Sequence, residues 1–246
     1  MYHFFVEPSG IGEKEIIITG PDVNHIRNVI RLKPGDEISI SNGIDGRDYR
    51  CGIARITEDE VVCELRFIKE DGVELPAKVY LFQGLPKGDK METVIQKNVE
   101  LGVYEIIPVA MKRSIVKLDA KKAEAKVKRW NGISESAAKQ SKRMIIPNVT
   151  KVMTYKEAIE YAKELDICLV PYENAKDMTH TREIIESIKN ESKVGIFIGP
   201  EGGFEEDEIE SAIALGMETI TLGKRILRTE TAGMAIMAVI ANMMEE

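Results

Sequence analysis

The sequence predicts a two-part protein, with a small β-barrel over residues 1–73 and an α/β domain with a mostly parallel sheet over residues 74–246. Short β-branched runs separated by turn residues fill the first part, which is typical of an all-β domain. From Ala77 onward, apolar runs alternate with segments whose apolar residues recur at helical spacing, which indicates strands joined by crossover helices. The stretch KEDGVELPAK (69–78) between the parts has the composition of a boundary.

The first part contains four expected strands and one helix. Apolar Val23, Ile26, Val29 and Ile30 recur at helical spacing, and Asp22 is a possible cap of that helix. The expected strands are EKEIIIT (13–19), DEISISN (36–42), YRCGIARI (49–56) and EVVCELRFI (60–68), and the helix is PDVNHIRNVIRL (21–32).

The second part reads as strand, helix, strand in repeated order. Its first helix is expected to be capped by Asp89 and to end at Gly102. Such alternation favours a parallel sheet covered by helices on both faces. The expected strands are 78–85, 104–110, 166–173, 194–198 and 217–223, and the expected helices are 89–102, 121–141, 205–216 and a long C-terminal helix.

Composition excludes several classes of function. Hydrophobic residues make up 43% and charged residues 30% of the chain, which is ordinary for a globular protein. The three cysteines form no C-x-x-C pair, and with three histidines no metal-ligand spacing appears, so we expect no metal. Without a signal peptide or an apolar run long enough to span a membrane, a cytoplasmic location is the default expectation.

Charge is unevenly distributed along the chain. The net charge is −7, yet residues 86–151 carry 15 basic and 7 acidic side chains. This basic region suits binding of phosphates, although a solvated helix surface explains it equally well.

Ligands of α/β sheets bind beyond the carboxyl ends of the strands, which here leads to QGLPKGDK, VPYENAKD and IGPEGGF. The first has the wrong spacing for a Walker phosphate loop, and no G-x-G-x-x-G occurs. The last, residues 198–204, is followed by four consecutive carboxylates, Glu205 to Glu208, where a helix would begin. Because these repel phosphate, the turn favours a neutral or cationic ligand, although a plain tight turn is an equally simple interpretation.

The segment LGKRILRTETAG (222–233) places three cations just before the C-terminal helix. Thr229 or Thr231 could cap that helix, which would explain the hydroxyl residues structurally. Lys224, Arg225 and Arg228 are harder to explain in that way, because a guanidinium suits phosphates and base edges.

Several motifs in one order resemble the ribosomal RNA small subunit methyltransferase E family. One departure is Ser136, where we expect an acidic residue. The motifs are NHIRNVIRLKPGD (24–36), GLPKGDKMETVIQKNVELGV (84–103), PVAMKRS (108–114), KRWNGISESAAKQSKRMIIPNV (128–149), IGPEGGF (198–204) and LGKRILRTETA (222–232).

The resemblance implies a PUA-like β-barrel, an RNA-binding domain, over residues 1–73 and a SPOUT methyltransferase domain over residues 74–246. SPOUT domains have a trefoil knot, a rare exception among folds. It further implies a homodimer that uses S-adenosylmethionine to methylate N3 of a uridine in 16S rRNA of the small ribosomal subunit. By motif position, the cofactor-binding residues would be Pro171, Glu173, Ile198, Gly199, Pro200, Glu201, Gly202, Leu222, Gly223, Ile226, Leu227 and Thr231.

For catalysis we expect Arg228 to stabilise negative charge on the uracil carbonyls, and Glu230 to orient Arg228 or to accept the N3 proton. A structural alternative for Glu230 is stabilisation of its own helix. Trp130 is expected to be a packing residue rather than a stacking platform. Candidate RNA contacts are His25, Arg27, Arg31, Lys112, Arg113, Arg129, Lys139 and Arg143.

Two alternatives remain open from the sequence. A non-catalytic RNA-binding or ribosome-assembly protein could use the same basic region. A related methyltransferase could act on another base or on a ribose 2′-OH.

Overall fold

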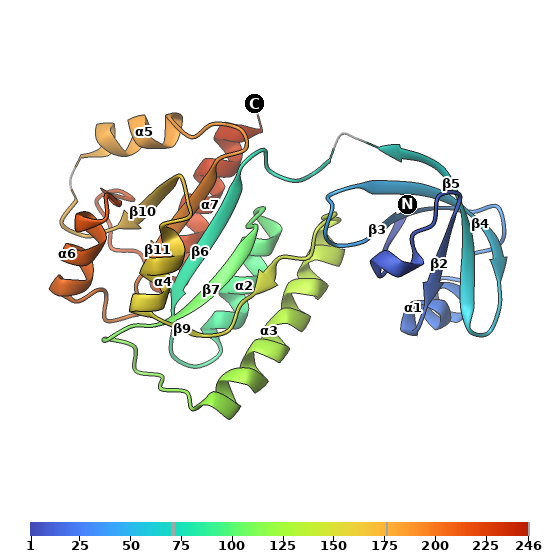
Figure 1. The fold of residues 1–246 in the computed structure, drawn as a ribbon, viewed down its shortest axis with the longest axis horizontal. Coiled ribbons are helices and arrows are strands. Elements are labelled where there is room, and N and C mark those ends of the chain that lie inside the picture. The colour runs from blue at the N-terminus through green and yellow to red at the C-terminus, as the bar shows by residue number, and fades with distance from the viewer. Residues whose placement is uncertain (70–71, 176, 246) are drawn as a thin grey trace. The chain divides into compact units, whose positions relative to one another are not determined.

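The computed structural model describes residues 1–69, 72–175 and 177–245. The chain divides into two compact units (Figure 1). The first contains Met1–Glu74 and Ala138–Ile146, and the second contains Leu75–Ala137 and Pro147–Glu246. Each unit is described in turn.

The first unit is a five-stranded sheet in the order β1-β3-β4-β5-β2, curled around an apolar core (Figure 1). In β2 the side chains alternate between solvent and core, so Ile16 and Ile18 are buried while Ile17 is exposed. This confirms the predicted small β-domain and its four strands. The strands are β1 (Tyr2–Phe5), β2 (Glu15–Thr19), β3 (Glu37–Ser41), β4 (Asp48–Ile56) and β5 (Glu60–Lys69).

The first strand, which the sequence pattern did not reveal, runs parallel to β3. Its His3 places Nδ1 2.9 Å from Oγ of Ser39 and Nε2 3.1 Å from Oγ of Ser41. Burial lowers the pKa of His3 to about 4, and this effect outweighs the opposing charge of Asp48. The ring is therefore neutral at physiological pH.

The predicted helix of the first unit is shorter and less regular than expected. The helix α1 (Pro21–Asn24) begins after Gly20, so Asp22 lies in its first turn and does not cap it. A π-helical turn, η2 (His25–Val29), continues the chain. A 3-10 turn, η1 (Pro8–Gly10), lies between β1 and β2.

The second unit is built on a sheet in the order β12-β10-β11-β6-β7-β8, with β9 also paired to β7, and every pairing is parallel. The predicted α/β fold is confirmed, whereas the trefoil knot stays a prediction. The strands are β6 (Lys78–Gly84), β7 (Glu105–Ala110), β8 (Asn148–Val149), β9 (Met153–Thr154), β10 (Ile167–Pro171), β11 (Lys193–Ile198) and β12 (Glu218–Ile220).

Helices cover both faces of this sheet. Phe82 and Phe197 stack at 4.2 Å between ring centroids on the face that packs against α4 and α6. On the other face α2 and α7 pack together, and Leu81 lies near Gly233 of α7. Burial from both sides explains the continuous apolar runs of β6 and β11. The helices are α2 (Lys90–Glu100), α3 (Ala120–Ser141), α4 (Tyr155–Ala162), α5 (Met178–Glu186), α6 (Glu206–Ala214) and α7 (Thr229–Met244).

Helix caps differ from expectation in two places. Asp89 occupies the N-cap position of α2 but its side chain makes no capping hydrogen bond. Arg228, and neither Thr229 nor Thr231, is the N-cap of α7. The helix α4 was not among the predicted helices, although Thr154 and Glu157 form a complete capping box there and give a readable T-x-x-E signal.

The three cysteines are buried and unpaired. Burial raises the pKa of Cys51 and Cys63 to about 12 and that of Cys168 to about 11, so the thiols are protonated and unreactive. Among residues 1–69, 72–175 and 177–245, no group of three or more His, Cys, Asp or Glu side chains is placed to hold a metal ion. Within the same ranges no helix has the length and apolarity needed to cross a membrane.

Candidate functional site

The strand order places a switch point between β6 and β11, two parallel neighbours whose onward connections run to opposite sides. The chain passes from β6 through α2 to β7 on one side, and from β11 through α6 to β12 on the other. Ligands of open α/β sheets bind outside the carboxyl ends of such strands. The residues just beyond these ends are Leu85 to Asp89 and Gly199 to Gly203, and we call the latter the switch-point turn.

The switch-point turn lies directly against the end of β6. A Cβ atom on Gly84 would lie 2.7 Å from both N and Cδ of Pro200 and 3.0 Å from the carbonyl carbon of Gly199. No side chain fits in that space, so glycine at position 84 permits the two segments to touch. Residues 84 and 200 therefore act as one surface, although they are far apart in the sequence.

A buried hydrogen-bond chain joins this surface to the start of α7. Gln83 donates through Nε2 to the Gly84 carbonyl at 2.9 Å and to Oγ1 of Thr229 at 2.8 Å. Thr229 in turn donates to the Gly199 carbonyl at 2.6 Å. The Thr229 hydroxyl thus fixes the first turn of α7 to both strand ends. Oε1 of Gln83 is buried without a hydrogen-bond partner.

Lys90, the first residue of α2, brings two carboxylates together. Its Nζ lies 3.0 Å from Oε1 of Glu201 and 3.4 Å from Oε2 of Glu230. The second contact is an ion pair, and Oε2 of Glu230 is buried with no hydrogen bond of good geometry from the described residues. Burial acts to raise the pKa of Glu201, but hydrogen bonds from Lys90 and from backbone N–H groups outweigh it, and the net pKa is lowered. Glu201 is therefore ionised and held in place.

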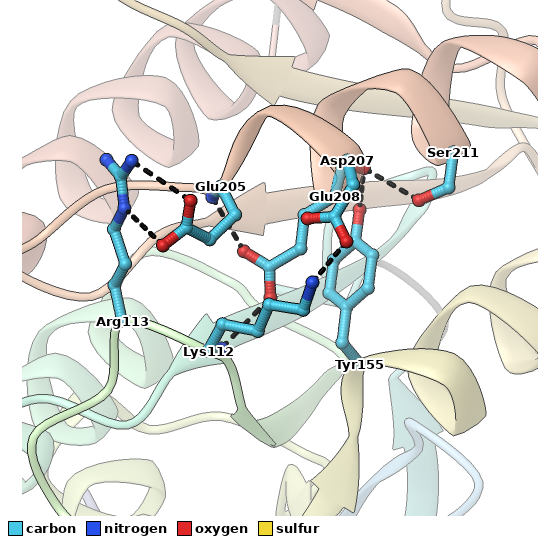
Figure 2. Close-up of polar contacts among 7 residues, drawn as sticks. All are labelled: Lys112, Arg113, Tyr155, Glu205, Asp207, Glu208 and Ser211. Carbon is cyan, nitrogen blue, oxygen red and sulfur yellow. Dashed lines mark hydrogen bonds and ion pairs between the residues drawn. The ribbon is translucent and has the colours of Figure 1, made fainter.

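The beginning of α6 is attached to the segment that follows β7 (Figure 2). Arg113 donates to the Gly202 carbonyl at 3.0 Å and pairs with Glu205 at 3.0 Å. Lys112 pairs with Asp207 through its side chain, and its backbone N–H donates to Glu208 at 3.0 Å. These contacts join the end of the switch-point turn and the start of α6 to the segment after β7.

This attachment changes the interpretation of the acidic run. In sequence, four successive carboxylates repel a phosphate, but Glu205, Asp207 and Glu208 are each engaged by Lys112 or Arg113. The hydrogen bond from Arg113 lowers the pKa of Glu205, and that from Lys112 lowers the pKa of Asp207. Electrostatic exclusion of phosphate is therefore weaker than predicted, since the pairs partly cancel the charge.

The residues predicted to bind the cofactor lie at the ends of three neighbouring strands. Pro171 ends β10, Ile198 ends β11, and Leu222 follows β12. Tyr172 donates its backbone N–H to the Ile220 carbonyl at 3.0 Å, which joins the loops after β10 and β12. Ile226 is 86% exposed, which is unusual for an isoleucine. Glu173, Gly199, Pro200, Glu201, Gly202, Gly223, Leu227 and Thr231 occupy the same loops and the first turn of α7.

The predicted catalytic residues are next to this surface but do not touch each other. Arg228 is exposed at the N-cap of α7, and its side chain forms no ion pair or hydrogen bond within the described chain. Lys224 and Arg225 are likewise exposed and unpaired among the described residues. Glu230 faces Lys90 rather than Arg228. Sequence reasoning missed Gln83 and Lys90, because nothing in their local pattern shows that α7 packs beside them.

The predicted RNA contacts fall into two groups. His25, Arg27 and Arg31 are exposed on the first unit, and Arg27 lies 3.7 Å from Glu58. Lys112, Arg113, Arg129 and Lys139 are paired with the carboxylates of Asp207, Glu205, Glu92 and Asp22, respectively.

Arg143 differs from the other predicted contacts, because it is 3% exposed and donates through Nε to Glu74 at 3.1 Å. Glu74 also accepts the backbone N–H of Met144 at 2.9 Å. This arrangement favours a structural role for Arg143 within the first unit.

Both units match known protein families in sequence. A family model described as RNA methyltransferase domain matches residues 73–241, and one described as RNA methyltransferase PUA domain matches residues 18–66. The chain is 40% identical over 227 residues to the ribosomal RNA small subunit methyltransferase E of Bacillus subtilis, covering 91% of this chain and 88% of the relative.

Solved structures are similar over nearly the whole length. One is a ribosomal RNA small subunit methyltransferase E from Neisseria gonorrhoeae bound to S-adenosyl methionine, with a TM-score of 0.82, 30% identity, and coverage of 98% of this chain and 97% of that chain. Another, from Legionella pneumophila in complex with the same cofactor, has a TM-score of 0.80, 28% identity, and coverage of 98% and 96%. The fold is thus that of an RNA methyltransferase domain with a PUA domain. The chain belongs to the ribosomal RNA small subunit methyltransferase E family.

Proposed function

We propose that this protein transfers the methyl group of S-adenosylmethionine to N3 of a uridine in 16S rRNA of the small ribosomal subunit. The observation that carries this proposal is the exposed Arg228 beside the switch point, which has no partner among the described residues, in a chain whose family relatives are ribosomal RNA methyltransferases. Lys90, Lys112 and Arg113 have carboxylate partners, whereas Arg228, like Lys224 and Arg225, has none among the described residues and keeps its full donor capacity for a substrate.

The loops after β10, β11 and β12 have the features that such a cofactor needs. Gly223 has a φ of 107°, which favours glycine, and nothing lies within 4 Å of where its Cβ would be, so its backbone is open to a ligand. At Gly199 and Gly202 that space is taken by Phe204 and Arg113. Oε1 of Gln83, one residue before the end of β6, is buried and has no hydrogen-bond partner among the described residues, so it could accept a hydrogen bond from a ligand. When bound, S-adenosylmethionine supplies an electrophilic methyl group on a sulfonium cation. The residues that would hold it are those of the loops that follow these three strands, together with Thr231.

Arg228 has the chemistry that the substrate requires. N3 of uridine carries a proton between two carbonyls, and loss of that proton spreads negative charge over O2, N3 and O4. A guanidinium beside one carbonyl stabilises that charge as the N3–H bond breaks. Since N3 lies on the Watson–Crick edge, the target base must be unpaired or flipped out to reach the residue.

Glu230 is proposed as the acceptor of the N3 proton. An orienting role toward Arg228 has no support, because within the described residues Glu230 contacts Lys90 and not Arg228. Its Oε2 atom is buried 3.4 Å from Nζ of Lys90, so the proton would go to the other carboxylate oxygen, Oε1. Lys90 would hold the carboxylate in position for this step.

We further propose a homodimer that acts in the cytoplasm and binds RNA through the first unit and the basic segments. Val239 and Met243 of α7 are 45% and 39% exposed, which supports an apolar contact between copies. His25, Arg27 and Arg31 are exposed and support RNA binding by the PUA domain. Sedimentation velocity of the full chain tests the dimer.

The test of the reaction is incubation of unmethylated small subunits with labelled cofactor, followed by mapping of the labelled nucleotide. We expect 3-methyluridine in 16S rRNA as the single product. A labelled purine or 2′-O-methyl nucleoside would instead assign a different methyl acceptor, and no transfer together with intact RNA binding would indicate a non-catalytic RNA-binding protein.

A matched pair of variants tests the role of Arg228. Arg228→Ala should lower kcat by roughly 100- to 1,000-fold, the usual loss for one donor to a developing anion, while cofactor affinity stays unchanged. Arg228→Lys keeps the charge but not the donor fork and should retain part of the activity. Wild-type kcat in the alanine variant would remove Arg228 from the mechanism.

A further inference from the structure

The outer face of the first-unit sheet presents an aromatic ring to solvent. Phe67 of β5 is 59% exposed, whereas the other five phenylalanines of the chain are buried or half-buried. Its partner across the strands is Arg50 of β4, and residues directly opposite each other project from the same face of a sheet. Since Tyr49 and Cys51, on either side of Arg50, belong to the core, Phe67 points away from the core.

Cations surround Phe67 on this outer face. Lys69 follows two residues later in β5, so its side chain projects from the same face, and it is exposed. Arg66 directly precedes Phe67 and lies over Gly52, where a Cβ would be 2.8 Å from its Nη2 atom. We call Arg50, Arg66, Phe67 and Lys69 the Phe67 face.

The carboxylate within this face is already neutralised. Asp48 lies opposite Lys69 in the register of β4 and β5, but it is 3% exposed and pairs with Arg50 at 2.6 Å. Lys69 has no ion pair or hydrogen bond among the described residues. Its ammonium is therefore available to an anionic ligand beside the Phe67 ring.

Exposed carboxylates mark where the Phe67 face ends. Glu37 and Glu64 lie on either side of Gly52 in the sheet. Arg66 pairs with Glu37, and Glu64 is exposed. The cationic surface thus extends from Arg66 toward Lys69, with the aromatic ring between them.

We propose that the Phe67 face binds an unpaired nucleotide of the rRNA substrate, with its base stacked on Phe67 and adjoining phosphates on Lys69 and Arg66. An exposed aromatic ring beside cations is a general means of holding single-stranded RNA, because every base has a π face. An apolar protein partner would instead bury the Lys69 ammonium without a counter-charge, which is unfavourable. The inference rests on the proposed function in that the ligand is RNA, but the face shares no residue with the methyl-transfer site.

Photocrosslinking of the full chain tests where the RNA lies. The probe is a single-stranded RNA of about 12 nucleotides that contains 5-iodouridine, a base that crosslinks to an aromatic ring on which it stacks. Trypsin cleaves after Arg66 and Lys69, so mass spectrometry can identify a crosslink on the peptide that contains Phe67. We expect this peptide among the crosslinked products.

A matched pair of variants separates stacking from packing. Phe67→Ile and Phe67→Tyr both keep a residue suited to a strand, but only tyrosine keeps the ring. In fluorescence anisotropy with the same RNA, Phe67→Ile should bind about 5- to 150-fold more weakly, the usual loss for one stacked base, and Phe67→Tyr should bind as wild type. Ile17→Ala, which changes a 37% exposed side chain on β2 of the same sheet, should also bind as wild type.

Lys69→Gln tests the phosphate contact. A single phosphate contact with a single strand contributes about 0.7 to the slope of log affinity against log salt concentration, so the variant should show a slope smaller by about that amount. An unchanged slope would remove Lys69 from the interface.

Equal RNA affinity of Phe67→Ile and Phe67→Tyr, or crosslinks confined to other peptides, would overturn the assignment of the Phe67 face to RNA. Methyl transfer to 16S rRNA is measured in parallel. Either overturning result together with normal methyl transfer would leave the proposed function standing. A crosslink at Phe67 without any methyl transfer would support the RNA-binding face and contradict the proposed function.

Discussion

Gly84 is the position where a single methyl group should do the most damage to the site. Its φ lies outside the left-handed region, so alanine can adopt the same backbone conformation. The obstacle is space alone, since the new Cβ would lie 2.7 Å from two atoms of Pro200, one of them backbone nitrogen. Gly84→Ala therefore forces the switch-point turn away from β6.

The expected cost follows from two opposing terms. Overpacking of a filled interior by one methyl group costs about 1–3 kcal/mol. Replacement of glycine by alanine restricts the unfolded chain and returns about 0.4–1 kcal/mol. The net loss of unfolding free energy should therefore lie between about 0 and 2.6 kcal/mol, and movement of the turn should weaken S-adenosylmethionine binding.

The assay pairs urea unfolding, followed by Trp130 fluorescence from the same unit, with calorimetric titration of the cofactor. Gly132→Ala is the matched control, because nothing lies within 4 Å of a Cβ at that position inside α3. This control should gain about 0.5–1 kcal/mol and bind the cofactor normally. If Gly84→Ala were as stable as wild type with unchanged cofactor affinity, the steric reasoning would be refuted.

Three further predictions concern single side chains. Thr229→Val removes one acceptor of the Gln83 Nε2 group and should lower the unfolding free energy measured in urea by about 1–3 kcal/mol. Thr229→Ser keeps the hydroxyl and should lose less, and equal losses in the two variants would contradict the hydrogen-bond role. Burial lowers the pKa of His3 from 6.5 to about 4, so the unfolded chain binds the proton more readily than the folded chain. As the pH falls from 6.5 to about 4, the unfolding free energy of the first unit should therefore decrease by at most about 3 kcal/mol. His3→Asn should flatten that dependence in urea titrations monitored by circular dichroism. The hydrogen bond from Arg113 lowers the pKa of Glu205 below 4.5. The ion pair therefore stabilises the fold fully above pH 4.5, and this stabilisation is lost as the pH falls through the lowered pKa. Arg113→Gln should remove that part of the dependence of unfolding free energy on pH, and an unchanged dependence would argue against the pair.

Local pattern was sufficient to place most helices and strands. The continuous apolar runs of β6 and β11 and the helical spacing in α2 are properties of short segments. The fold buries these apolar residues, so each local pattern predicted its element. The elements that were not predicted include β1 and α5, which are short and have weak hydrophobic periodicity. The capping box of α4 shows that a local signal existed and could have been used.

The candidate site was located by the sequence but not assembled by it. IGPEGGF lies at a strand end, as expected, and LGKRILRTETA leads into α7. The ion pairs could not be predicted, because a sequence gives the number of cations but not the carboxylate that each cation contacts. Lys112 and Arg113 are engaged with α6, and Arg143 is buried with Glu74, whereas Arg228 stays unpaired within the described chain.

Sequence pattern was enough to predict the kind of fold, the family motifs and the turn at residues 199–203, whereas what that turn touches depends on tertiary structure. Only the placement of β11 beside β6 brings Pro200 against Gly84, and only the packing of α7 brings Glu230 to Lys90 and Thr229 to Gln83. These partners are separated by more than a hundred residues, and hydrophobic periodicity has no range beyond one helix or strand. Strand order arises from the burial of whole faces against each other, so the contacts that build the site exist only once the sheet has formed.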